Sequence, residues 1–481
     1  MMETEKTNGN ELKDLQKELS YKKTSAWESL DKQAAFGFAQ EYKEFLLNKT
    51  EREFAKATVD MLKSCGFIDI DDAGELKPND KVYKSIRGKG VTIAIIGQSG
   101  GMDGYNITAA HLDSPRLDLK QIPLYEDEGA ALALFKTHYY GGIKKYQWAT
   151  IPLALHGVIY TKDSQKVEVC IGEDENDPVF VVSDLLVHLA SEQMGLKASE
   201  VITGEQLNIA IGNMPIEGDG DVSQKIKLNI LKILNEKYGI DEDSFITAEI
   251  EAVPAGKPRD VGFDSSMIAA YGHDDRVCSF AALKGILSAT DPKRTCICIL
   301  ADKEEIGSLG ATGLQSRLYE NFIASLFAKC NGSYDELAFR RSLELTNVLS
   351  MDVDAAYDPT FSSAFEIKNS AVIGSGSAMT KFTGARGKSS SNDADAEYIR
   401  ALFDLFKKNG VPVQMTELGK VDQGGGGTVA FILAQKGSNT VDYGVPVLSM
   451  HAPMEVISKV DLYSAYQGAK AFYESDIVIK H

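Results

Sequence analysis

Apolar residues recur at helical spacing through the first 65 residues of the chain. They stand roughly three to four positions apart among lysines and glutamates, at Leu12, Leu15, Leu19, Phe36, Phe38, Tyr42, Phe54, Val59 and Leu62. This spacing places the side chains on one face of an α-helix. The pattern therefore predicts helices across residues 1–65.

Short β-branched runs replace this pattern further along the chain. Runs of strand length occur at 91–96, 158–160, 167–171 and 180–182. From about Ala269, further apolar runs at 295–300, 347–351, 370–373 and 445–450 alternate with helical patterns at 395–408 and 460–473. Strands that alternate with helices are typical of an α/β layer around a mostly parallel sheet.

The segment from about Leu117 to Gly262 differs in texture from the sequence on either side. It combines β runs, the turn-rich stretches 172–178 and 218–221, and a helical pattern at 224–238. We interpret it as a second, mainly-β domain inserted into the first. The predicted division is 1–112 and 263–481 for the α/β domain, and 113–262 for the insert.

Composition and charge narrow the classes of function. The chain has 481 residues, 43% of them hydrophobic, and a formal net charge of -18. This acidic excess argues against a general nucleic-acid binder or a protein held on an anionic membrane, because both need a basic face. No apolar run approaches the ~18 residues of a membrane span, and residues 1–23 do not resemble a secretory signal. Six cysteines in so long a chain form no disulfide framework, so we expect a reduced, cytoplasmic protein.

Residues that bind metals follow several of the apolar runs. His111 ends one run, with Asp113 two positions on, and the other candidates are Glu304, Glu305, Asp352 and His451. In open α/β sheets, sites form beyond the carboxyl ends of the strands. Any one of these residues has an ordinary explanation, but together they are hard to attribute to core packing.

Asp274 and Asp275 open a helical stretch beside these runs. Such a pair is common as a helix N-cap, so by itself it indicates little. Two neutral histidines with Asp274, Glu305 and Asp352 supply three negative charges, which two divalent cations and one hydroxide ion balance. Histidine and carboxylate ligands without a thiolate suit zinc, with cobalt or manganese as possible replacements.

The motifs around these residues resemble those of the M18 family of metalloaminopeptidases, the group of aspartyl aminopeptidase and aminopeptidase I. The matching stretches are TAAHLDSP, GHDDRVCSFAAL, DKEEIGS, SMDVDAAYDP and SMHAPMEV, in the expected order from about residue 90 to the C-terminus. The resemblance implies a three-layer α/β/α zinc-exopeptidase domain with an inserted dimerisation domain. It also implies a dodecamer built from six dimers.

By this resemblance, His111 and Asp352 bind one metal, Glu305 and His451 bind the other, and Asp274 bridges them. Asp113 orients His111, and Glu304 is the general base. Family members often have Asp-Asn where this chain has Asp274-Asp275, so the choice of Asp274 over Asp275 as the bridge stays open. The resemblance also implies a cis peptide bond between these two residues.

Two further residues match the family pattern less closely. His188, in the stretch SDLLVH, resembles a histidine that enters the neighbouring subunit's active site and stabilises the tetrahedral intermediate; the alternative is an amphipathic-helix residue. Lys381 resembles a lysine that contacts substrate; the alternative is a surface residue. The expected reaction is removal of N-terminal residues from peptides.

Other functions remain open on the sequence. A related dinuclear deacylase or carboxypeptidase would use the same ligands, and a structural or binding shell could keep an inactive site. Phosphate binding by the glycines at 384–389 or 423–427 is disfavoured, because neither stretch is a Walker A loop. The motif His-Glu-x-x-His is absent, which argues against thermolysin-type chemistry.

Overall fold

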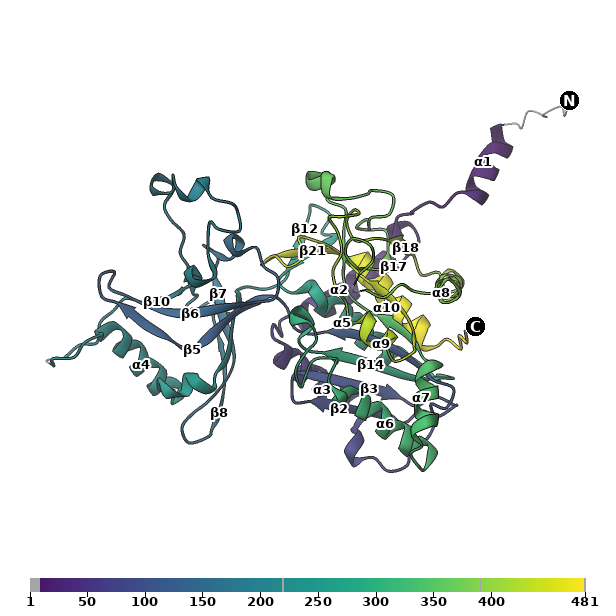
Figure 1. Ribbon diagram of the computed structural model, residues 1–481, viewed down its shortest axis with the longest axis horizontal. Helices are drawn as coiled ribbons and strands as arrows, with labels where there is room; N and C mark the ends of the chain where they lie inside the picture. Colours follow the sequence, from purple (N-terminus) through teal and green to yellow (C-terminus); the bar gives the residue numbers. More distant parts are fainter. Residues whose placement is uncertain (1–8, 219, 390, 480–481) are drawn as a thin grey trace.

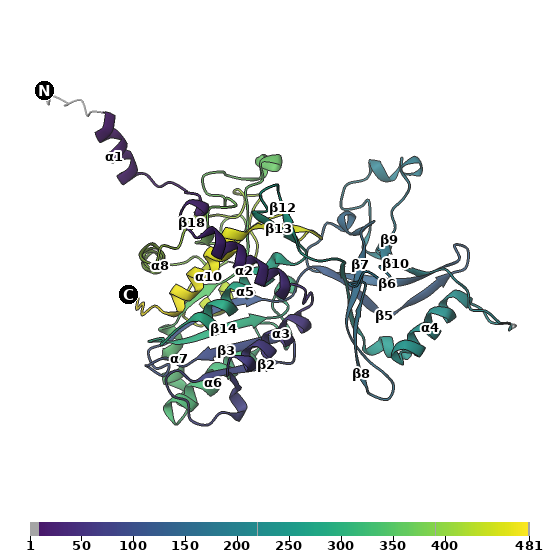
Figure 2. The same cartoon turned by 180° about the vertical axis from the view of Figure 1, so that it is seen from behind.

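Two parts of the molecule lie side by side, a larger α/β part and a smaller sheet-rich part (Figure 1). The computed structural model describes residues 9–218, 220–389 and 391–479. Both described ends of the chain belong to the α/β part, as the view from behind also shows (Figure 2). None of the helices in these ranges is long and apolar enough to cross a membrane.

A nine-stranded sheet forms the centre of the α/β part. Its order is β1 (Ile68–Asp69), β2 (Lys81–Ile86), β3 (Gly90–Ile95), β14 (Thr295–Ala301), β4 (Tyr105–His111), β15 (Asn347–Ser350), β19 (Asn439–Gly444), β17 (Ser377–Thr380) and β18 (Val413–Thr416). The central strands β14, β4, β15 and β19 run parallel. Their carboxyl ends therefore meet at one edge of the sheet.

Helices cover both faces of this sheet, which makes a three-layer α/β/α structure. One face carries α2 (Lys32–Phe45), α3 (Glu51–Ser64), α5 (His273–Ser288), α8 (Ala396–Lys408) and α10 (Lys459–Tyr473). The other carries α6 (Arg317–Asn331), α7 (Glu336–Glu344) and α9 (Ala430–Ala434). In β14, Cys296 and Cys298 face the first layer and Ile297 the second, so both sides of the strand are apolar. The expected α/β class is confirmed.

Local sequence explains where the helices form. A capping box, in which Thr50 and Glu53 exchange side-chain and backbone hydrogen bonds, begins α3. The buried face of α8 repeats every fourth residue, at Tyr398, Leu402 and Phe406. The predicted N-terminal helix forms as α1 (Gly9–Leu19), but its three leucines are exposed.

The α/β part also contains a separate five-stranded sheet. Its order is β12 (Arg259–Val261), β13 (Met267–Ala270), β21 (Glu455–Ser458), β20 (Pro446–Leu448) and β16 (Asp354–Ala355). Strand β13 leads into α5, and the loop between β20 and β21 carries His451. This sheet therefore positions the start of α5 and the loop with His451, neither of which belongs to the nine-stranded sheet.

The sheet-rich part has its own seven-stranded sheet and apolar core. The strand order is β8 (Lys166–Ile171), β7 (Leu153–Tyr160), β11 (Glu249–Pro254), β5 (Arg116–Asp127), β6 (Leu132–Tyr140), β10 (Ile209–Gly212) and β9 (Val181–Val182), with α4 (Lys225–Tyr238) packed on it. We propose that this part is the inserted domain, 113–262. Strand β12 lies inside that range but pairs with β13 of the α/β part.

One predicted strand, 370–373, does not form. Ser370 closes a turn by donating its backbone N–H to the carbonyl of Glu366, and Ala371 makes only an isolated bridge. The side chain of Gln414 then bonds both the N–H and the carbonyl of Val372. That prediction was wrong because a side chain occupies the backbone groups that a neighbouring strand would use.

Short 3-10 helices complete the described structure. Two matter for the site, η4 (Val187–Leu189) and η8 (Glu304–Ile306). The others are η1 (Ala26–Glu28), η2 (Ile70–Asp72), η3 (Lys145–Trp148), η5 (Gln193–Gly195), η6 (Gly204–Gln206), η7 (Asp243–Thr247) and η9 (Pro359–Ala364).

Candidate metal centre

Three parallel strands bring candidate ligands to one edge of the nine-stranded sheet. His111 is the last residue of β4. Asp352 follows β15 by two residues, and Glu304 and Glu305 follow β14 on η8. Because neighbouring parallel strands end at the same edge, segments far apart in sequence meet here.

Asp274 and His451 reach the same place from different elements. Asp274 lies in the first turn of α5, where its ψ of 108° is not helical. The peptide bond between Asp274 and Asp275 is cis, as the family resemblance implied. His451 follows β20 with a φ of 63°, so its loop turns sharply toward the sheet edge.

The two oxygens of Asp274 face two different imidazoles. Oδ1 lies 3.4 Å from Nε2 of His111, and Oδ2 lies 3.1 Å from Nε2 of His451. On the first side, Asp352 Oδ1 is 3.8 Å from His111 Nε2. On the second side, Glu305 Oε1 is 3.6 Å from His451 Nε2. The ligand candidates thus form two groups that share Asp274.

Both histidines present Nε2 to this cluster because Nδ1 is engaged elsewhere. Nδ1 of His111 is 3.0 Å from the main-chain carbonyl of Asp113 and 3.4 Å from its carboxylate. Nδ1 of His451 is 2.8 Å from the carbonyl of Gly142. A carbonyl only accepts, so each Nδ1 carries a proton, and Nε2 is the nitrogen that each histidine offers to a metal.

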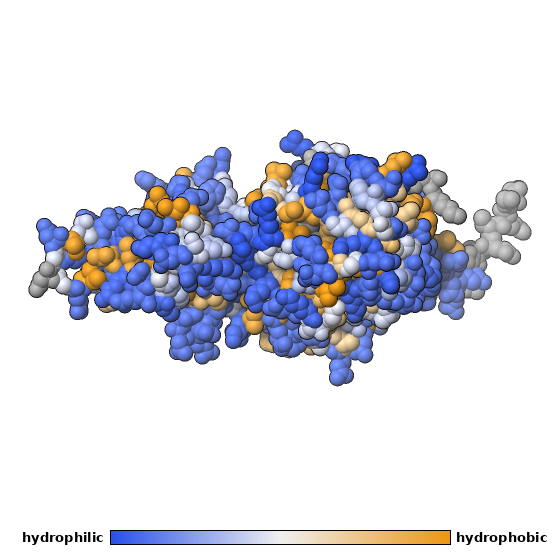
Figure 3. Space-filling model, turned by 90° about the horizontal axis from the view of Figure 1, so that it is seen from below, coloured by the Kyte–Doolittle hydropathy of each residue, from blue (hydrophilic) through white to orange (hydrophobic). Residues whose placement is uncertain are grey.

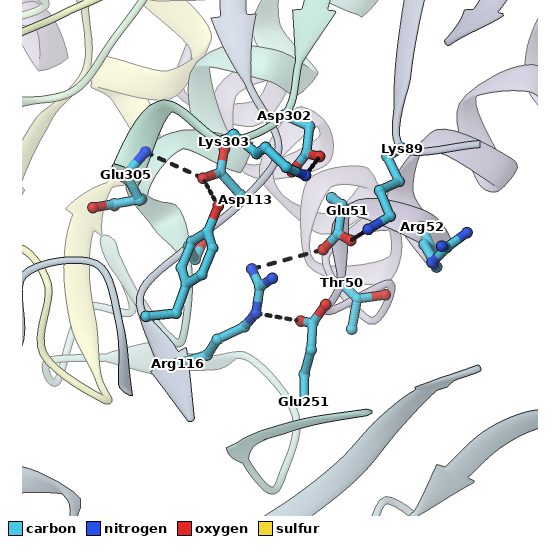
Figure 4. A network of polar contacts seen from close by, with 12 residues as sticks. Thr50, Glu51, Arg52, Lys89, Asp113, Arg116, Glu251, Asp302, Lys303 and Glu305 are labelled. Atoms are coloured by element: carbon cyan, nitrogen blue, oxygen red, sulfur yellow. Dashed lines mark hydrogen bonds and ion pairs between the residues drawn. The ribbon is translucent and has the colours of Figure 1, made fainter. Parts of the chain in front are cut away.

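The carboxylate of Asp113 holds the backbone of both glutamates. It accepts hydrogen bonds from the N–H of Glu304 at 3.0 Å and of Glu305 at 3.1 Å. The hydroxyl of Tyr140 donates to the same carboxylate at 2.8 Å. Figure 4 shows the contact of Asp113 with Glu305. A fully buried carboxylate with three donors is firmly oriented.

Glu455 supports two ligand candidates at once, and the sequence reasoning missed it. Its Oε2 accepts the N–H of Asp274 at 3.0 Å, and its Oε1 accepts the N–H of His451 at 2.7 Å. Asp275, by contrast, accepts the backbone N–H of His111 at 3.3 Å. Glu455 lies within the quoted stretch SMHAPMEV, so a signal was present, but only its hydrogen bonds reveal its role.

The electrostatics of the cluster favour added positive charge. Burial raises the pKa of Glu304 to about 8, and neighbouring carboxylates add to this effect. Burial and Asp274 raise the pKa of Glu305 well above its usual range. Although burial opposes it, the hydrogen bond with Asp274 raises the pKa of His451 to about 10. Carboxylates crowded in this way take up protons or cations.

A cavity of about 540 Å³ opens onto the cluster. Its lining includes Phe431 and Met450, the glycines 425–427, and all five ligand candidates with Glu304. None of the described residues that line it is Lys or Arg. Glu305 Oε1 is buried and has no hydrogen-bond partner among the described residues. This donor set, rich in carboxylates and closed by two imidazoles, fits divalent metal ions.

A family model described as aminopeptidase I zinc metalloprotease (M18) matches residues 46–473. A probable M18 family aminopeptidase 1 of Clostridium acetobutylicum is 52% identical over 456 residues, which cover 93% of this chain and 97% of the relative. The chain belongs to the M18 family of zinc metalloaminopeptidases. The resemblance inferred from the motifs is therefore confirmed.

Solved M18 structures have the same fold. The crystal structure of an M18 aminopeptidase from Thermotoga maritima is 43% identical, with a TM-score of 0.91 over 95% of this chain and all of that one. A yeast structure described as an mApe1 dodecamer is 20% identical, with a TM-score of 0.73 over 91% of this chain and 96% of that one. At that identity the likeness concerns the fold.

The two remaining M18 candidates lie outside the cavity lining. His188 is exposed on η4 of the sheet-rich part. Lys381 directly follows β17, and its Nζ is 3.9 Å from Asp393 Oδ1. Neither joins the metal-ligand cluster within this chain.

A second group of metal-type residues lies away from this centre. It combines Glu53, His156 and Cys170. The imidazole nitrogens of His156 are 2.8 Å from Glu53 and 3.0 Å from Glu173, and Lys49 also binds Glu173 at 2.6 Å. Two positive and two negative groups balance one another here, so the cluster is an ion-pair network between the two parts of the molecule.

Proposed function

We propose that this M18 aminopeptidase releases N-terminal amino acids from peptides with two divalent metal ions. The main support is the placing of His111 and His451 against separate oxygens of Asp274. A carboxylate between two imidazoles is suited to bridging a pair of metals. His111 with Asp352 would hold one ion, and His451 with Glu305 the other. Zinc fits this donor set best, with cobalt or manganese as possible replacements.

When bound, two such cations supply Lewis-acid activation of water and of the scissile carbonyl. Glu304 is the proposed general base, because it lines the cavity and the other five residues suffice as ligands. Its carboxylate takes a proton from the attacking water and passes it to the leaving amine. Asp113 positions Glu304 through the backbone N–H, and Glu455 holds Asp274 and His451 in the same way.

We further propose that the protein works as a homo-oligomer, with the dodecamer as the expected form. The loop around η4 exposes apolar side chains, at Leu185, Leu186, Val187, Leu189, Met194 and Leu196. A patch of exposed apolar side chains is typical of a surface that contacts another protein. The face seen in Figure 3 is largely hydrophilic, with apolar patches on both parts. The yeast mApe1 dodecamer has the same fold.

In such an assembly, His188 would act in the partner's cavity as a donor to the developing oxyanion. Lys381 would contact substrate from the loop after β17. The six cysteines are all free, which supports the proposed cytoplasmic location. The preference for an acidic or a neutral N-terminal residue is the property to measure first.

The test compares Asp-, Glu-, Leu- and Met-p-nitroanilides with N-acetyl-Leu-p-nitroanilide and with an unblocked peptide, and metal content is measured on the same samples. We expect hydrolysis only of substrates with a free amine, loss of activity after chelation and recovery with zinc. Release of acyl groups would indicate a deacylase, and release of C-terminal residues from unblocked peptides a carboxypeptidase. Two bound metals without turnover of any substrate would indicate a binding shell.

A further inference from the structure

Three consecutive residues of the sheet-rich part touch the metal centre of their own chain. They are Tyr140, the last residue of β6, and Gly141 and Gly142, which follow it. Tyr140 donates to Asp113, and the carbonyl of Gly142 faces His451 Nδ1. The sheet-rich part is thus in direct contact with residues that hold the proposed metals.

The contact with Gly142 decides which nitrogen of His451 can bind a metal. The carbonyl accepts the Nδ1 proton at 2.8 Å. Nε2, which faces Asp274 and Glu305, is therefore the nitrogen left for a metal. Loss of the hydrogen-bond partner of a metal-binding histidine typically weakens metal binding or activity about 10- to 100-fold.

The contact with Tyr140 acts through Asp113. Oδ2 of Asp113 accepts both the Tyr140 hydroxyl at 2.8 Å and the Glu305 N–H at 3.1 Å. Without the hydroxyl, the buried carboxylate would lose one of its three donors. The orientation of Glu304 and Glu305 would then be less well defined, although both backbone hydrogen bonds remain.

Arg116 holds Tyr140 in place. Its guanidinium carbon lies 3.8 Å from the centre of the Tyr140 ring, a cation–π contact. Arg116 is itself bound by Asp118 at 2.8 Å. It also binds Glu251 at 3.2 Å and Glu51 at 3.7 Å (Figure 4). Glu51 belongs to α3, so this buried network ties Tyr140 to the α/β part.

The two glycines allow the segment to pass this close. Gly141 has a φ of 73°, and a Cβ there would lie 3.1 Å from Glu305 Oε2. A Cβ on Gly142 would lie 3.3 Å from His451 Nδ1. An added Cβ therefore has to shift the neighbouring ligand candidate by a few tenths of an ångström, and at Gly141 it also strains the backbone.

We propose that Tyr140, Gly141 and Gly142 are positioning residues for the metal ligands, so that metal affinity depends on the sheet-rich part. The inference rests on the proposed dinuclear centre. It assigns these residues no contact with the reacting atoms. They act through Asp113, Glu305 and His451.

The first test is Tyr140→Phe, which removes the hydroxyl and keeps the ring over Arg116. Tyr125→Phe is the matched control, because Tyr125 is a half-buried tyrosine of the same sheet that pairs with Leu134, near the other end of the β5–β6 pair from Tyr140. Zinc affinity is measured by competition with a chelating dye, and the Co²⁺-loaded proteins are compared by visible absorption. We expect about 10-fold weaker zinc binding and an altered Co²⁺ spectrum in Tyr140→Phe and not in the control. In Tyr140→Phe, kcat should fall while KM changes little.

The second test is Gly142→Ala, with Gly129→Ala in the β5–β6 turn as control. A Cβ at Gly129 meets no atom closer than 3.4 Å. A Cβ at Gly142 would press on Nδ1 of His451 at 3.3 Å, so we expect Gly142→Ala to weaken one of the two zinc-binding steps and the control to weaken neither. Because the metal readouts use folded protein, thermal unfolding of the metal-free variants is measured first.

Wild-type zinc affinity and Co²⁺ spectra in both Tyr140→Phe and Gly142→Ala would overturn the inference. If the metal-free Gly142→Ala protein is unfolded, the result for Tyr140→Phe alone decides the inference. Wild-type protein that binds two metals but cleaves no free-amine substrate contradicts the proposed function alone. Wild-type protein that binds no divalent metal contradicts both.

Discussion

Oδ2 of Asp274 lies 3.1 Å from Nε2 of His451, while the other oxygen faces His111 at 3.4 Å. Glu455 fixes the backbone of both Asp274 and His451. Asp274 therefore lies between His111 at the end of β4, His451 in the loop after β20 and Glu455 on β21.

Replacing Asp274 by Ala should release both metals, because the residue contacts both halves of the cluster. Asp275→Asn should keep both, since Asp275 bonds the backbone of His111 and an amide oxygen can replace that acceptor. Metal content per chain, measured after gel filtration, checks this. Two metals still bound in Asp274→Ala would rule out the bridge.

Glu304→Gln should keep two metals and lower kcat about 10²- to 10⁴-fold. The amide preserves size and the backbone hydrogen bond to Asp113 but cannot accept the proton. Steady-state kinetics and metal analysis on one sample provide the measurement. Glu397→Gln, an exposed site at the start of α8, is the control. Near-normal turnover in Glu304→Gln would remove its role as base.

His188→Phe should lower kcat about 100-fold, the cost of losing one oxyanion donor, without changing metal content. Mixing His188→Phe with Glu304→Gln subunits tests whether the histidine acts across subunits. Reassembled mixtures should recover part of the activity, because a chain with intact Glu304 can then receive His188 from its partner. Mixtures as inactive as their parents would place the role of His188 within its own chain.

A charge in the exposed apolar loop should prevent association. Leu189 is 70% exposed, so Leu189→Asp should hardly lower the stability of the single chain. A charge buried in a contact between two chains, by contrast, strongly weakens that contact. Light scattering after gel filtration should show a smaller particle than the wild type, with Lys197→Asp in the same segment as a comparison for charge alone. An unchanged mass for Leu189→Asp would exclude the loop from the interface.

The ion-pair network around His156 should make stability depend on pH. Although burial opposes protonation, Cys170, Glu173 and Glu53 raise the pKa of His156 to about 11. The folded protein then holds a proton that the unfolded chain loses above pH 6.5. The contribution of His156 is complete below pH 6.5 and declines toward pH 11, by up to about 1.4 kcal/mol per pH unit.

Thermal or urea unfolding of wild type and His156→Gln between pH 6 and 9 checks this. The stability difference should be largest at pH 6 and shrink as pH rises. His138→Gln, an exposed histidine in the same sheet, serves as the control. A difference that stays constant with pH would mean that His156 is not charged in the folded protein.

Much of the fold follows from local pattern. The helices α2, α3, α8 and α10 form where apolar spacing predicts them, and β3, β14 and β15 form at the β-branched runs. The pattern fails at 370–373, where Gln414, distant in sequence, takes the backbone hydrogen bonds of Val372. It also could not indicate that the apolar face of α1 stays exposed.

By itself the sequence determined which residue types follow which strands, and hence the candidate ligands His111, Glu305 and Asp352. Its motifs carried the resemblance to the family. Strand ends can be recognised from neighbouring residues, because alternation and apolar runs are local properties. The tertiary structure alone decided that the two oxygens of Asp274 face two imidazoles. It also decided that the carbonyl of Gly142 accepts the Nδ1 proton of His451. Such contacts join residues up to 309 positions apart, and only the packing of separate sheets sets distances of that kind.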